Sequence, residues 1–286
     1  MIVSGKARLA GVMGWPVGHS RSPRLHGYWL EKLGIDGAYV PLPVRPEDFQ
    51  QALEVLPCMG FVGANVTVPH KEQALVLADE VEPLARRIGA VNTLVFHDDG
   101  SVEGRNTDAF GFLENLRRGA PDWAPEAGPA VVLGAGGAAR AVCAALVDAG
   151  VPEIRLVNRS TSRAEQVAKD VGGMISVMGW DQAARALDGA VLLVNATTLG
   201  MTGQPPLELA LDRLPTSAVV NDIVYAPLVT DLLARAAARG NPAVDGLGML
   251  LWQAVPGFEA WFGVRPEVTA EPAGVRSRLD RGRLHP

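Results

Sequence analysis

The sequence has few of the residues on which metal and thiol chemistry depend. Only two of its 286 residues are cysteine, and its five histidines show no metal-ligand spacing such as His-Glu-x-x-His. Cys143 lies among small apolar residues, which favours a buried packing role, while Cys58 lies in a Pro-Cys-Met-Gly loop that indicates no function. We therefore expect no metal site.

Three further absences concern partners and location. The net charge of −5 gives no excess of positive charge of the kind that binds nucleic acid. No apolar run approaches the roughly 18 residues of a membrane-spanning helix, and the N-terminus lacks a basic segment followed by an apolar one. The sequence therefore predicts a cytoplasmic protein that binds neither nucleic acid nor membrane, and its length suggests two domains of ordinary size.

The middle of the chain does contain a pattern that is typical of nucleotide binding. It consists, in order, of an apolar strand over 131–133, a glycine turn over 134–140, a helix over 141–149 and a second strand over 154–157. Gly134 permits the tight turn, Gly136 lets backbone amides approach a pyrophosphate, and Ala139 lets the helix pack close to the sheet. The helix N-terminus then faces the anion. A tight turn without a ligand is the alternative.

The end of the second strand indicates which dinucleotide binds. An acidic residue there usually meets a free ribose 2′-hydroxyl, whereas arginine meets a 2′-phosphate. This chain has Arg159, with Arg163 one helical turn later. Two charge-assisted hydrogen bonds of about 1.5–3 kcal/mol each would favour NADP over NAD by about two orders of magnitude or more. The sequence predicts NADP; the alternative is that both arginines only solvate a helix start.

Polar residues near helix starts in the N-terminal half suggest a second pocket. Ser22, followed by proline, is typical of a helix N-cap, and Ser20 lies just before it, in a geometry that suits a small carboxylate or phosphate. A simple cap and a turn residue are an equal alternative. In the strand over 61–68, Asn65 and Thr67 alternate onto one face and so line a pocket.

Two charged residues also begin predicted helices. Lys71 lies at a helix N-terminus, where the dipole opposes a cation and favours an acid–base role; an exposed surface lysine is the simpler alternative. Asp108 precedes the apolar run 110–116 and is either its N-cap or a pocket carboxylate.

In the C-terminal half, strands and helices continue to alternate. Thr197, Ile223 and Tyr225 follow apolar strands, and ligands of a doubly wound sheet bind at the carboxyl ends of its strands. A long apolar helix ends near Phe262, and the arginine-rich tail 276–286 has little to bury, so we expect it to be disordered.

Together these segments resemble the shikimate dehydrogenases, over nearly the whole chain and in the family's order. The matching motifs are Gly14–Pro23, Asn65–Lys71, Asn92-Thr93, Asn106–Asp108, Gly134–Arg140, Asn158–Ser160, Asn195–Thr197, Asp222–Tyr225 and Asp245–Gln253. The segments 65–71 and 106–108 are the most specific, and they favour the pocket alternatives for the two serines and for Asp108. One departure is Asp231, where the family often has proline.

The resemblance implies an α/β fold with two domains. An N-terminal α/β substrate domain, residues 1–107 and 247–286, would flank a Rossmann-type doubly wound NADP-binding domain, residues 108–246, with the cleft between them. The catalytic pair would be Lys71 and Asp108. The implied substrate-binding residues are Ser20, Ser22, Asn65, Thr67, Lys71, Asn92, Asp108, Tyr225 and Gln253. The implied NADP-binding residues are Gly134, Ala135, Gly136, Gly137, Ala138, Asn158, Arg159, Ser160, Arg163, Thr197, Ile223 and Gly246.

The resemblance also implies an activity, the reversible NADPH-dependent reduction of 3-dehydroshikimate to shikimate in aromatic amino acid biosynthesis. The partners would be small molecules only, and the protein a monomer or homodimer. A quinate/shikimate dehydrogenase of broader cofactor use is an alternative that Arg159 disfavours, and an aminoshikimate-pathway paralogue would look similar. A noncatalytic NADP-binding regulator would have no reason to keep Lys71 and Asp108 together.

Overall fold

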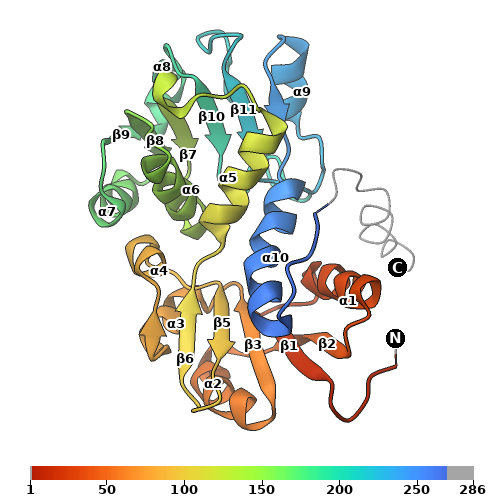
Figure 1. Ribbon diagram of the computed structural model, residues 1–286. Coiled ribbons are helices and arrows are strands. Elements are labelled where there is room, and N and C mark those ends of the chain that lie inside the picture. The colour runs from red at the N-terminus through yellow and green to blue at the C-terminus, as the bar shows by residue number, and fades with distance from the viewer. Residues whose placement is uncertain (1, 269–286) are drawn as a thin grey trace. The chain divides into compact units, whose positions relative to one another are not determined.

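The computed structural model describes residues 2–268, and they form two compact units (Figure 1). Of the described residues, unit 1 contains 2–86, 90–107 and 254–268. Unit 2 contains Arg87–Gly89 and Asp108–Gln253. The tail 276–286, for which the sequence predicts disorder, lies outside the described residues.

Unit 1 is built on a six-stranded mixed sheet with the strand order β2-β1-β3-β5-β6-β4. Its strands are β1 (Arg8–Gly14), β2 (Gly37–Pro43), β3 (Phe61–Val66), β4 (Glu80–Val81), β5 (Thr93–Phe96) and β6 (Val102–Arg105). Its helices are α1 (Ser22–Leu33), the 3₁₀ turn η1 (Pro46–Asp48), α2 (Phe49–Cys58), α3 (Lys71–Leu77) and most of α4 (Pro83–Ile88). The parallel strands β2, β1 and β3 continue into the antiparallel strands β5 and β6, so one sheet joins distant segments.

The second half of α10 (Leu247–Phe262) completes the core of unit 1. Phe258 and Trp261 are fully buried, and the Trp261 indole Nε1 donates to the Leu94 carbonyl over 2.9 Å. A side chain at Gly63 would collide with the Trp261 ring, so glycine is needed at this place in β3. The core of unit 1 therefore depends on residues from both ends of the chain.

Unit 2 is built on a six-stranded parallel sheet with the strand order β12-β11-β10-β7-β8-β9. Its strands are β7 (Ala130–Leu133), β8 (Ile154–Asn158), β9 (Ile175–Gly179), β10 (Leu192–Asn195), β11 (Val219–Asp222) and β12 (Ala243–Val244). Its helices are α5 (Asp108–Gly119), η2 (Pro125–Ala127), α6 (Gly137–Asp148), α7 (Thr161–Val171), η3 (Trp180–Gln182), α8 (Ala183–Ala186), α9 (Asp231–Ala238) and the first half of α10.

The order of these strands confirms the doubly wound fold that the sequence predicts. The chain runs outward from β7 to β8 and β9, then returns to the other side of β7 with β10 and β11 (Figure 1). Strands β7, β10 and β11 are buried at every residue, as expected of parallel strands covered on both faces. The strand order reverses between β7 and β10, which is where such sheets bind ligands.

Candidate active site

The two serines of the N-terminal half lie at the start of α1, and Ser22 does not cap this helix. The helix begins at Ser22 itself, its N-cap position is Arg21, and no side chain caps it, so the predicted N-cap role of Ser22 is wrong. The Ser20 hydroxyl oxygen accepts from the Ser22 backbone N–H over 3.3 Å. The Ser22 hydroxyl instead donates to the hydroxyl oxygen of Tyr39 on β2. The Ser22 hydroxyl therefore belongs to a side-chain network that includes Tyr39.

That network continues from Tyr39 to the two asparagines predicted to bind substrate. The Tyr39 hydroxyl donates to Asn65 Oδ1 over 2.7 Å, at the end of β3. Asn65 Nδ2 in turn donates to the Asn92 carbonyl oxygen (3.2 Å) and to Thr93 Oγ1 (3.1 Å). Burial raises the pKa of the Tyr39 hydroxyl well above its usual value, so it remains a hydrogen-bond donor. The predicted residues Ser22, Asn65 and Asn92 therefore lie within one connected group.

Thr67 and Lys71 lie on the segment that follows Asn65. The Thr67 backbone N–H donates to the Met13 carbonyl over 2.9 Å, and Gly14 makes room for the Thr67 methyl group, which a side chain there would strike. Lys71 is half-buried and is the first residue of α3, as predicted. Its carbonyl oxygen accepts from the Val91 N–H over 2.9 Å, which places the start of α3 beside the segment that carries Asn92.

In unit 2, the predicted glycine turn joins β7 to α6. Gly134 has a φ of 104°, and an added Cβ would lie 3.0 Å from the Ala196 carbonyl oxygen. Gly136 takes the N-cap position of α6 with φ −89° and ψ −176°, which other residues also adopt, and an added Cβ there meets no atom within 4 Å. No side chain caps α6. Because the fold itself does not require glycine at 136, open space beside the uncapped helix start fits a bound pyrophosphate.

The end of β8 carries the residues predicted to select the cofactor. Asn158 Nδ2 donates to the Ser160 carbonyl over 2.9 Å, and the Ser160 hydroxyl pairs with that of Ser162. Arg159 and Arg163 are exposed, and no ion pair with either is found within residues 2–268. Two guanidinium groups are thus available beside the strand end, where a 2′-phosphate would bind.

A buried pair at the ends of β10 and β11 joins two of the motifs noted in the sequence, by a bond that the sequence did not reveal. Asn195 Oδ1 accepts from the backbone N–H and the hydroxyl of Thr197 (3.1 and 2.7 Å), and its Nδ2 donates to Asp222 Oδ1 (3.0 Å). Asp222 also accepts from the Val224 N–H (3.0 Å) and the Thr230 hydroxyl (2.7 Å). Burial raises the Asp222 pKa, while these three donors oppose the shift.

This pair fixes the two loops that carry Thr197 and Ile223. Ile223 lies between Asp222 and Val224, which are joined by the bond from the Val224 N–H to the Asp222 carboxylate. The Ile223 N–H donates to the Asn195 carbonyl over 3.1 Å. A side chain at Gly246 would collide with the Ile223 backbone, so glycine there permits the loops to meet. The predicted cofactor residues Thr197, Ile223 and Gly246 therefore lie together at the carboxyl edge of the sheet.

The remaining predicted substrate residues belong to unit 2. Asp108 is buried and is the first residue of α5, and Tyr225 is half-buried after β11. Gln253 is the last residue of unit 2, on α10, where Gly111 of α5 approaches so closely that an added Cβ would lie 2.7 Å from its backbone nitrogen. Lys71 belongs to unit 1 and Asp108 to unit 2, so their pairing remains a prediction.

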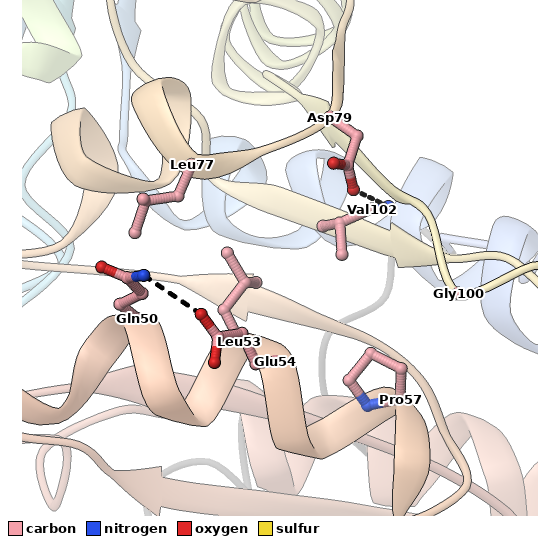
Figure 2. Close-up of a pocket in the computed structure, with 8 residues that line it drawn as sticks. All are labelled: Gln50, Leu53, Glu54, Pro57, Leu77, Asp79, Gly100 and Val102. Carbon is pink, nitrogen blue, oxygen red and sulfur yellow. Dashed lines mark hydrogen bonds between the residues drawn. The ribbon is translucent and has the colours of Figure 1, made fainter.

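A separate pocket of about 260 Å³ in unit 1 contains none of the predicted site residues. Its lining residues are Gln50, Leu53, Glu54, Pro57, Leu77, Asp79, Gly100 and Val102 (Figure 2). Gln50 donates to Glu54, and Asp79 accepts from the Val102 backbone N–H, so both carboxylates already have protein partners (Figure 2). Within residues 2–268, no three or more His, Cys, Asp and Glu side chains are grouped so that they could hold a metal ion. None of the helices in this range combines the length and the hydrophobicity of a membrane span.

Comparison with known proteins identifies the family. Residues 12–94 match a family model described as the shikimate dehydrogenase substrate binding domain, residues 125–201 one described as shikimate / quinate 5-dehydrogenase, and residues 246–270 one described as the shikimate 5′-dehydrogenase C-terminal domain. A shikimate dehydrogenase (NADP(+)) of Paramagnetospirillum magneticum is 70% identical over 267 residues, which cover 93% of this chain and 97% of that protein. Its counterpart in Rhodospirillum rubrum is 63% identical over 271 residues, covering 93% and 96%.

Solved structures agree with this assignment. Shikimate 5-dehydrogenase from Thermus thermophilus, in complex with NADP(H) and shikimate, has a TM-score of 0.83 and 39% identity, covering 96% of this chain and 99% of that one. Quinate dehydrogenase from Corynebacterium glutamicum, in complex with NAD, has a TM-score of 0.87 and 31% identity, covering 95% and 97%. On the strength of its motifs, its fold and these matches, the chain belongs to the shikimate dehydrogenase family.

Proposed function

We propose that this chain catalyses the reversible, NADPH-dependent reduction of 3-dehydroshikimate to shikimate in the shikimate pathway of aromatic amino acid biosynthesis. The observation that carries the proposal is 70% identity, over nearly the full length of both chains, to a shikimate dehydrogenase (NADP(+)). A cytoplasmic location and a monomeric or homodimeric state are part of the same proposal. So is the assignment of residues 1–107 and 247–286 to a substrate-binding domain and of residues 108–246 to an NADP-binding domain.

The substrate carboxylate would bind at Ser20 and Ser22, with Tyr225 near it. Hydroxyl and amide groups suit this role because they recognise a carboxylate and ring hydroxyls by directed hydrogen bonds. The ring hydroxyls would bind to Asn65, Thr67, Asn92, Asp108 and Gln253. Supporting this, Ser22, Asn65 and Asn92 are already joined by hydrogen bonds through Tyr39.

Proton transfer would fall to Lys71. NADPH, which residues 134–138 and the turn after β8 would hold, would supply a hydride to the C3 carbonyl carbon of the substrate. As the C–H bond forms, the carbonyl oxygen gains negative charge and needs a proton, which the Lys71 ammonium would donate while Asp108 holds its orientation. Lys71 would then regain a proton from solvent, and in the reverse direction it would accept the proton from the C3 hydroxyl.

The choice of NADP rests on the end of β8. Arg159 and Arg163 would bind the 2′-phosphate, while Asn158 and Ser160 hold the turn that carries them. The pyrophosphate would lie against the backbone of residues 134–138. A related quinate dehydrogenase binds NAD, so quinate oxidation with NAD is the second candidate activity.

Initial rates separate the two candidates. The purified protein is assayed with shikimate and with quinate, each with NADP and with NAD, by the formation of reduced cofactor. We expect kcat/KM to be at least about 100-fold higher for shikimate with NADP than for quinate with NAD, given two phosphate-binding arginines. A higher value for quinate with NAD would assign the second activity, and no turnover with any pair would refute both.

A further inference from the structure

Thr93 lies between Asn65 and Asn92 and has no part in the chemistry proposed above. Its side chain is fully buried on β5. Its hydroxyl oxygen accepts from Asn65 Nδ2 over 3.1 Å, and its hydroxyl donates to Asn92 Oδ1 over 2.9 Å. It thus joins two amides, one on β3 and one on the residue just before β5.

Two backbone groups of fixed polarity determine how these amides are oriented. The Asn92 carbonyl can only accept a hydrogen bond, so Asn65, whose amide lies 3.2 Å from it, must turn Nδ2 toward it. The Thr107 backbone N–H can only donate, so Asn92 must turn Oδ1 toward it, over 2.9 Å. Each asparagine therefore has one orientation that satisfies its backbone partner.

Only a hydroxyl satisfies both amides at position 93. The group there must accept from the Asn65 nitrogen and donate to the Asn92 oxygen, and a single hydroxyl does both. Valine has nearly the same shape but can do neither, so it would leave one buried amide hydrogen and one amide oxygen without this partner.

The same bonds decide what Asn65 can offer a ligand. Both of its amide hydrogens are donated within the protein, to the Asn92 carbonyl and to Thr93. Its oxygen receives one hydrogen bond from Tyr39 and has a second lone pair. Asn65 in this orientation is therefore an acceptor toward a ligand and never a donor.

We propose that Thr93 is a positioning residue, whose hydroxyl holds Asn65 so that its amide oxygen accepts a hydrogen bond from a substrate hydroxyl that is not oxidised in the reaction. We assign Asn65 to a hydroxyl that is not oxidised because a hydroxyl that becomes a carbonyl loses the hydrogen that the Asn65 oxygen must accept. This inference rests on the proposed function, since it takes shikimate as the ligand.

The test compares Thr93→Val, which removes the hydroxyl, with Thr93→Ser, which keeps it. Steady-state constants are measured with shikimate, with NADP, and with two shikimate analogues that each lack one ring hydroxyl other than the C3 hydroxyl. We expect Thr93→Val to raise the KM for shikimate about tenfold, with kcat within about threefold of wild type and the KM for NADP unchanged. Thr93→Ser should restore the wild-type KM to within about twofold.

The analogues distinguish positioning from a general structural role. In the wild type, removing the hydroxyl held by Asn65 should raise KM, and in Thr93→Val that penalty should shrink by at least about threefold. A role in folding alone would leave the penalty unchanged. Melting temperatures of both variants check that they fold, and Thr93→Ala replaces the valine variant if that one does not.

Other outcomes would overturn the inference. These are a wild-type KM for shikimate in Thr93→Val, an equal rise in the KM for NADP, a serine variant as impaired as the valine one, or an unchanged analogue penalty. Failure of the proposed function is a different result, because it appears as wild-type protein that does not turn over shikimate with NADP.

Discussion

Two glycines of the turn after β7 should respond to alanine in opposite ways. Gly134 has a left-handed φ of 104°, and its added Cβ would lie 3.0 Å from the Ala196 carbonyl oxygen and 3.1 Å from the Thr197 methyl carbon. Backbone strain of this kind costs roughly 1–3 kcal/mol. We expect Gly134→Ala to lower the free energy of unfolding of unit 2 by about 2 kcal/mol, which is a fall of about 4–8 °C in melting temperature.

Gly136→Ala should leave the fold intact and weaken cofactor binding. The backbone at 136, with φ −89° and ψ −176°, is one that alanine adopts, and its Cβ would meet no protein atom within 4 Å. Fewer conformations in the unfolded chain would even stabilise the protein by about 0.4–1 kcal/mol. The new methyl group would occupy the space proposed for the pyrophosphate, so losing one charge-assisted hydrogen bond should raise the KM for NADP about 10–100-fold.

The assay pairs thermal unfolding without cofactor with the KM for NADP, in the wild type and three variants. The third variant, Gly150→Ala, is the control for strain, since Gly150 has a φ of 87° and open space around it after α6. It should be destabilised by about 1–2 kcal/mol and keep the wild-type KM for NADP. A wild-type KM for NADP in Gly136→Ala, or a loss of stability there as large as in Gly134→Ala, would refute the reasoning.

Three other predictions concern single side chains. Lys71→Ala should lower kcat by about 10²–10⁴-fold with little change in the KM for shikimate, measured by NADPH formation; near-wild-type kcat would refute the assignment of the proton donor. Arg159→Ala should lower kcat/KM with NADP by about 10–100-fold and leave that with NAD unchanged, and an equal fall with both cofactors would contradict a contact to the 2′-phosphate. Burial raises the pKa of Cys143 to about 12, so in native protein at neutral pH a thiol reagent should modify only the exposed Cys58 and in denaturant both; two fast-reacting native thiols would show that α6 is not packed as described.

The fold could be predicted from local patterns because each pattern reports its own element. The glycine turn between two apolar runs indicates a strand, a helix and a strand whatever surrounds it, and β7, α6 and β8 occur in that order. The same holds for α3, which begins at Lys71. The helix α6 begins at Gly137, inside the predicted turn, rather than at residue 141.

Partners in three dimensions could not be predicted in this way. Alternation along β3 indicates that Asn65 faces a pocket, but it does not indicate that Tyr39, 26 residues earlier, donates to it. The bond between Asn195 and Asp222 joins residues 27 apart, and only the sheet order brings them together. A serine followed by proline is typical of a helix N-cap, yet the Ser22 hydroxyl bonds to Tyr39, on a strand that local sequence does not connect to it.

The discontinuity of unit 1 has a consequence for protein synthesis. Its sheet is made from the first 107 residues, yet Trp261, which fills the space above Gly63 and bonds to Leu94, leaves the ribosome about 150 residues later than that sheet. Nearly all of unit 2 is made in the interval and can fold first. Until α10 is synthesised, the part of the sheet that Phe258 and Trp261 cover in the folded protein is exposed. We therefore expect unit 1, rather than unit 2, to bind chaperones during synthesis.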